Sequence, residues 1–148
     1  MTAAYTDALR RQFDRQEDLD LFVAKFAHWK ASGEAGEYSA YLFGKDSAYA
    51  KLPAGMVTGQ LRHVHLAPIL DKDALAAWDK AFARGSRKVS NRALVYAQDA
   101  KGNFLLLFIL NEPDAHVIAQ METVEHKTLM RQFVQVAESW AFNGEIIA

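Results

Sequence analysis

The stretch RALVYAQDAKGNFLLLFIL, from Arg92 to Leu110, decides how this chain folds. Its two ends, residues 92–98 and 104–110, are rich in the β-branched, aromatic and large aliphatic residues that favour strands. Between them lies DAKGN, a five-residue segment whose length and composition suit a hairpin turn. Because a hairpin joins antiparallel strands, this stretch predicts an antiparallel sheet.

The segments on either side of the hairpin predict helices. Downstream, Pro113 ends the second strand, and a final helix is expected from about Val124. Upstream, Asp71 is a suitable N-cap for a short amphipathic helix that ends at Gly85. The apolar residues at helical spacing are Leu75, Trp78 and Phe82 in the first of these helices, and Met130, Phe133, Val136, Ala137 and Trp140 in the last.

A third strand is predicted over residues 61–67, which Pro68 closes. Its residues alternate, so Val64 and Leu66 share one face while His63 and His65 share the other. The chain begins with another helix, whose apolar face is formed by Leu19, Phe22, Val23, Phe26 and Trp29 and which ends at the glycines of residues 32–36. Residues 37–59 predict loops, and no strand is expected before the first helix.

The order helix, strand, helix, strand, strand, helix excludes a doubly wound parallel sheet. It predicts an α+β fold, in which a small antiparallel sheet of three to four strands packs against the N-terminal and C-terminal helices. A chain of 148 residues fits one domain, because domains usually contain roughly 100–200 residues. We therefore expect residues 1–148 to form a single domain.

Composition limits the chemistry that is available. The chain has no cysteine, which excludes disulfides, a thiolate nucleophile and every cysteine-ligated metal or iron–sulfur site. The N-terminus lacks the order of a signal peptide, and the longest apolar run, Phe104 to Leu110, is too short to span a bilayer, so we expect a cytoplasmic protein without membrane contact. The net charge of −1 does not favour a nucleic-acid binder.

Four of the five histidines fall in or just after the strand region: His63, His65, His116 and His126. Three interpretations of them stay open. They can act with cations in RNA cleavage, which needs a base, an acid and a positive charge on the phosphorane. Alternatively, His63 and His65 can be two ligands of a metal site completed by His116, His126 or Asp46. In the third interpretation they only pack and form hydrogen bonds.

Positive charge is concentrated in one segment. Residues 80–98 contain five bases and no acid. Arg84 is explained by the end of a helix, where cations interact favourably with the dipole. Arg87, Lys88 and Arg92 lie beyond Gly85, where a phosphate-binding role explains them as well as a helix end does. The candidate substrate-binding residues in this segment are Arg84, Arg87, Lys88 and Arg92.

Several short motifs, read together, resemble the YafO family of toxins. Their order and approximate spacing agree from about Tyr41 to Trp140, two-thirds of the chain. We therefore divide the chain into an N-terminal helical segment, residues 1–40, and a toxin-like core, residues 41–142. The motifs are Phe43-Gly44-Lys45-Asp46 with Tyr49, His63-Val64-His65-Leu66-Ala67, Ser86-Arg87 before Leu94-Val95-Tyr96, and Ile109-Leu110 followed by His116 and His126.

The resemblance implies a type II toxin with a RelE/ParE-like fold that cleaves messenger RNA on the ribosome and inhibits translation. The implied reaction needs no metal ion or cofactor: the ribose 2′-hydroxyl attacks the adjacent phosphate, cations stabilise the phosphorane, and an acid protonates the leaving 5′-oxygen. The implied partners are a cognate antitoxin, the ribosome and mRNA, and a second copy of the chain in a homodimer is a further candidate. A His-ligated metalloenzyme and a non-catalytic protein- or RNA-binding module are the alternatives.

The same resemblance assigns roles to particular residues. His63, His65, His116 and His126 match the histidines of the family, and Arg87 matches its Ser-Arg step. We expect His65 and His116 to transfer protons. Arg87, with Lys45 as a second candidate, is expected to bind the phosphate, for which a planar guanidinium is well suited.

Overall fold

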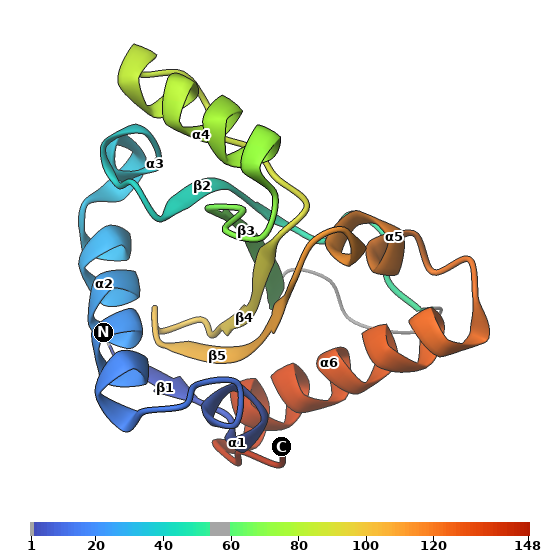
Figure 1. Cartoon of the computed structure of the whole chain (residues 1–148). Helices are drawn as coiled ribbons and strands as arrows, with labels where there is room; N and C mark the ends of the chain where they lie inside the picture. Colours follow the sequence, from blue (N-terminus) through green and yellow to red (C-terminus); the bar gives the residue numbers. More distant parts are fainter. Residues whose placement is uncertain (1, 54–59) are drawn as a thin grey trace.

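The computed structural model describes residues 2–53 and 60–148, and a five-stranded mixed sheet lies at its centre (Figure 1). The strand order is β1-β5-β4-β3-β2, with β1 parallel to β5 and the other neighbours antiparallel. The strands are β1 (Ala3–Tyr5), β2 (Phe43–Ala48), β3 (Leu61–Leu66), β4 (Ala93–Gln98) and β5 (Phe104–Leu110). The predicted α+β class is therefore confirmed.

The predicted hairpin is confirmed as β4 and β5, paired from Ala93 with Leu110 to Gln98 with Phe104. Its turn is held by Asp99, whose side chain accepts hydrogen bonds from the backbone N–H groups of Lys101 at 2.9 Å and Asn103 at 2.8 Å. Gly102 takes the left-handed conformation that the turn requires, with φ of +78°.

The expected strand number and the purely antiparallel sheet are wrong, because the sheet has two further strands. β1 pairs with the outer edge of β5, although no strand was expected before the first helix. β2, which pairs with β3, lies in the segment of residues 37–59 that was expected to be loop. The sequence of β2, FGKDSA, contains only one large apolar residue, and the register shifts between Phe43 and Asp46. A bulged edge strand of this kind has no regular alternation to detect.

Helices cover both faces of the sheet (Figure 1). α2 (Gln16–Ala31) packs on one face through an aromatic core that includes Phe26, Phe43 and Tyr96. α5 (Asp114–Gln120) and α6 (Val124–Asn143) pack on the other face against Val95, Leu105 and their neighbours. The remaining helices are α1 (Asp7–Arg10), a 3₁₀ turn (Gly33–Ala35), α3 (Gly36–Ser39) and α4 (Lys72–Arg84).

The helix ends agree with the predictions where capping residues marked them. The side chain of Asp71 accepts from two N–H groups at the start of α4, and Gly85 ends that helix with φ of +68°. Thr123 caps α6, which begins at Val124 as expected. α5 was not predicted, since it is only seven residues long and directly follows Pro113. Within the described residues, no helix is long and apolar enough to cross a membrane.

Candidate functional site

Strand β3 directs its side chains alternately to the two faces of the sheet, as predicted. Val64 and Leu66 lie in the aromatic core beneath α2. His63 is paired with Ser47 on β2 and Val95 on β4, and His65 is paired with Ala93. Because Val95 and Ala93 belong to the core beneath α5 and α6, both histidines lie on that side of the sheet.

His65 is almost fully buried, with 4% of its surface exposed. Its Nδ1 accepts a hydrogen bond from the backbone N–H of Ser90 at 2.8 Å. The Ser90 hydroxyl in turn donates to the carbonyl of Leu66 at 2.6 Å, which holds the 85–90 segment against the end of β3. Since Nδ1 is the acceptor, the proton of the neutral ring is on Nε2.

His116 on α5 brings a third imidazole to His65. The ring centroids of His65 and His116 are 5.3 Å apart, and those of His63 and His65 are 6.0 Å apart. His116 is exposed, whereas His63 is half-buried against the ring of Tyr49 at 4.3 Å. We call His63, His65 and His116 the imidazole row, because the buried ring of His65 lies between the half-buried His63 and the exposed His116.

The two inner imidazoles of this row are neutral at pH 7. Burial, with smaller electrostatic contributions from neighbouring groups, lowers the pKa of His65 to about 4 from its ordinary value of 6.5. Burial likewise lowers the pKa of His63 to about 4. The neighbours that depress the pKa of His65 are His63, His116, Lys45 and Arg87, so these groups share one electrostatic environment.

Arg87 and Lys45 reach this region from two adjacent segments. The N–H of Lys45 donates to the carbonyl of Lys88 at 2.9 Å, so the 85–90 segment runs beside β2. Gly44 makes this approach possible, because a Cβ there would lie 2.4 Å from the carbonyl oxygen of Lys88. Arg87 is half-exposed, and its Nε lies 3.0 Å from Glu37 on α3. One edge of its guanidinium is thus held by a carboxylate.

Two of the predicted substrate-binding residues form hydrogen bonds within the protein. Lys88 is fully buried, and its Nζ donates to the carbonyls of Glu37, at 3.0 Å, and Ala40. Arg92 donates to Asn111 and to the carbonyl of Ala67, both at 3.1 Å. In these positions Lys88 and Arg92 hold neighbouring segments of the chain together, and substrate binding by either residue stays a prediction.

Two other predicted residues lie outside the imidazole row. His126 is in the first turn of α6, where its backbone N–H donates to Thr123. Its Nδ1 is buried, and among the described residues this atom has no hydrogen-bond partner. Arg84 is exposed in the last turn of α4. Of the predicted set, the structure therefore places His63, His65 and His116 side by side, and Lys45 and Arg87 lie near enough to lower the pKa of His65.

The alternative of a histidine metal site is not supported by the geometry. Across residues 2–53 and 60–148, no three histidine, aspartate or glutamate side chains converge as metal ligands. Asp46, which was considered as a ligand, is paired with Val64 and lies on the opposite face of the sheet. Its carboxylate accepts from Tyr96 at 2.5 Å and forms ion pairs with Lys30 at 2.8 Å and Arg62 at 3.4 Å.

These four residues, Lys30, Asp46, Arg62 and Tyr96, form a cluster that we call the Asp46 network. Sequence reasoning missed it, although Arg62 directly precedes His63 and alternation places it on the opposite face. Sequence reasoning also missed Ser90, which determines the tautomer of His65. Both depend on contacts between segments far apart in the chain, and no local pattern signals them.

Comparison with known proteins gives one result. A family model described as "Toxin YafO, type II toxin-antitoxin system" matches residues 27–142. The match thus begins within α2, earlier than the expected boundary at Tyr41, and includes every member of the imidazole row and of the Asp46 network. No curated protein and no solved structure matches the chain, so a RelE/ParE-like fold stays a prediction.

Proposed function

The chain belongs to the YafO family of type II toxins, and from this premise we propose that it is a ribosome-dependent endoribonuclease. In this proposal it cleaves messenger RNA in the cytoplasm without a metal ion, and a cognate antitoxin protein restrains it. The observation that supports the proposal is that His116 lies beside His65, with Lys45 and Arg87 near enough to lower the pKa of His65. A phosphate group of RNA bound at this site would contact both the cationic side chains and the imidazoles.

The solvent exposure of each side chain indicates its role in the proposed reaction. His116 is exposed, so its imidazole accepts the proton of the attacking ribose 2′-hydroxyl. The oxygen attacks the adjacent phosphorus, and the bond to the 5′-oxygen breaks as that oxygen takes up a proton from water. The products are a 2′,3′-cyclic phosphate and a 5′-hydroxyl end. Arg87 and Lys45 stabilise the negative charge of the phosphorane.

His65 has a different part in this mechanism. Proton transfer by His65 stays a prediction, but its hydrogen bond from Ser90 favours a donor role for the neutral ring. With Nδ1 occupied, only Nε2–H is free, and it can donate to a phosphate oxygen or to His116. His65 thereby acts as a fixed, uncharged donor beneath the surface, while the solvent-facing groups move protons and charge.

The test is induced expression in bacterial cells, with mapping of new RNA 5′-hydroxyl ends and measurement of growth. Wild-type protein is expected to cleave mRNA and arrest growth. His116→Ala and Arg87→Ala should each reduce cleavage by about 100-fold or more, the range found for general base and electrostatic groups.

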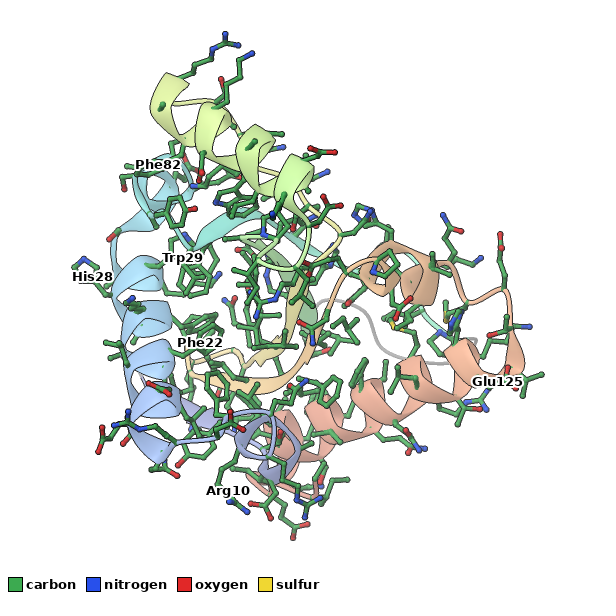
Figure 2. All side chains as sticks on the ribbon, viewed as in Figure 1. Arg10, Phe22, His28, Trp29, Phe82 and Glu125 are labelled. Carbon is green, nitrogen blue, oxygen red and sulfur yellow. The ribbon has the colours of Figure 1, made fainter. Side chains whose placement is uncertain are left out.

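Figure 2 shows suitable control residues, because His28 and Arg10 lie away from the sheet edge. His28 is exposed on α2, and Arg10 is exposed beside Asp7 on α1. His28→Ala and Arg10→Ala should leave cleavage unchanged. The proposal would be contradicted if cells expressing the wild-type protein grew normally and contained no new RNA ends. It would also be contradicted if the His116→Ala and His28→Ala variants were equally toxic.

A further inference from the structure

A cavity of about 540 Å³ lies on the α2 side of the sheet, at the edge near α3, and it shares Arg87 with the candidate active site. Its walls come from the end of α2, the 3₁₀ turn, α3 and strands β2 and β3. Arg87 also lines this cavity, so one guanidinium borders both the cavity and the electrostatic environment of His65. The volume is in the range of pockets that hold small ligands such as a nucleotide.

Most charged groups in the cavity wall already have partners. Asp46 accepts from Tyr96 and pairs with Lys30 and Arg62, and Glu37 pairs with Arg87. Glu34 differs, because it forms no ion pair among the described residues. Its carboxylate is exposed on the 3₁₀ turn, and among the charged groups that the structure describes in this wall it is the one without an ionic partner.

A free carboxylate in a cavity can select among RNA bases when a neighbouring arginine binds the RNA phosphate. Guanine presents two N–H donors, N1–H and N2–H, side by side on one edge, and these match the two oxygens of a carboxylate. Adenine and cytosine present a single amino group on that edge, and uracil presents one N–H. Single-stranded RNA is commonly read in this way, by hydrogen bonds to base edges and by stacking on aromatic rings.

Tyr38 supplies the aromatic surface. Tyr38 lines the cavity and is 42% exposed, so it is accessible to a stacking base. Trp29, labelled in Figure 2 on the sheet-facing side of α2, is 5% exposed and serves instead as a wall. We propose that this cavity binds a guanine base of the RNA strand, with Glu34 reading its edge and Arg87 holding the adjacent phosphate. The proposal deepens the nuclease function and rests on it for its biological role.

The site can be tested by direct binding, without cleavage. The probes are two short single-stranded RNAs, UUGUU and UUAUU, with 2′-O-methyl groups that prevent cleavage, titrated into the purified full-length protein. Wild type should bind the guanine probe about tenfold more tightly, the order expected for one bidentate base contact. Glu34→Gln should abolish this preference, whereas Glu125→Gln, an equal charge change at the start of α6, should retain it.

Tyr38→Ala provides an independent measurement. Because stacking is tolerant of base identity, this variant should weaken binding of both probes similarly and keep the preference for guanine. Equal affinity of wild type for the two probes overturns the inference, and so does an unchanged preference in a folded Glu34→Gln protein.

Cleavage mapping separates the two proposals. If wild type prefers the guanine probe but produces no RNA ends in cells, the nuclease function fails while the guanine site stands. If wild type cleaves RNA but does not distinguish the probes, the guanine site fails alone. Both proposals are supported if the wild-type protein cuts beside guanine and the Glu34→Gln variant cuts without regard to the neighbouring base.

Discussion

The two faces of strands β2 and β3 differ in how completely their polar groups are satisfied. On the α2 face, the Asp46 network joins one carboxylate to two cations and a phenol. On the other face, two neutral imidazoles and the exposed His116 lie near Lys45 and Arg87. Neighbours in sequence, Arg62 and His63, belong to different faces. One strand therefore contributes both to an ion-paired cluster and to a surface that can take up an anion.

This difference indicates that the ion pairs of the α2 face mainly stabilise the fold, whereas the other face is available for anion binding. A charge pair shielded from water contributes to stability only when its partners are complete, and removal of one partner is costly. Cations left partly free are available for a phosphate, at the expense of mutual repulsion. Stability and function can then be altered separately by substitutions on opposite faces of the same two strands.

The largest effect is expected from Asp46→Asn. This change leaves Lys30 and Arg62 without a counterion, with side chains only 15% and 25% exposed. We expect a loss of about 3 kcal/mol in the free energy of unfolding, measured by urea denaturation. Glu17→Gln is the control, because its ion pair with Arg15 is exposed and should change stability by less than about 0.5 kcal/mol. Similar losses in both variants would show that the network is not cooperative.

Gly44→Ala should disturb both faces at once. The added Cβ would lie 2.4 Å from the carbonyl oxygen of Lys88 and 2.8 Å from the ring of Trp78. Since backbone must move, the expected loss is on the order of 2–3 kcal/mol. Displacement of the 85–90 segment should also lower cleavage. A variant of normal stability would mean that this segment is held only loosely against β2.

The imidazole row predicts a pH dependence of stability. The pKa of His65 is lowered to about 4, so between pH 6.5 and 4 the unfolded chain binds a proton that the folded chain does not. Stability is therefore lost as the pH falls through this range. His65→Asn retains an acceptor for Ser90 but removes the titration. Relative to pH 7, wild type should lose about 2 kcal/mol more than this variant at pH 4.5. Parallel pH profiles would contradict the neutral, buried assignment.

The smallest effect on stability is expected at the surface of the candidate active site. Lys45→Ala and His116→Ala should each change the free energy of unfolding by less than about 0.5 kcal/mol. The same variants should nevertheless reduce cleavage strongly. Paired denaturation and cleavage measurements would separate these roles, and a stability loss above about 1 kcal/mol would assign either side chain to the fold.

Local signals predicted much of the fold and part of the site. The turn residues between β4 and β5 and the alternation in β3 are readable because they act over a few residues. β1 was missed because three residues carry no periodic pattern, and its partner in β5 lies about a hundred residues further along the chain. The positions of Lys88 and Arg92 were not foreseen, because the sequence does not show whether a cation is free in solvent or held by carbonyl groups of distant segments.

The sequence by itself determined the elements that have capping, turn or alternation signals, and it determined that His63 and His65 share a face. Tertiary structure alone decided which segments meet: His116 beside His65, the 85–90 segment along β2, and Asp46 between Lys30 and Arg62. The physical reason is range. Backbone preferences act between near neighbours, whereas burial, charge pairing and the tautomer of a histidine depend on residues brought together by the whole fold.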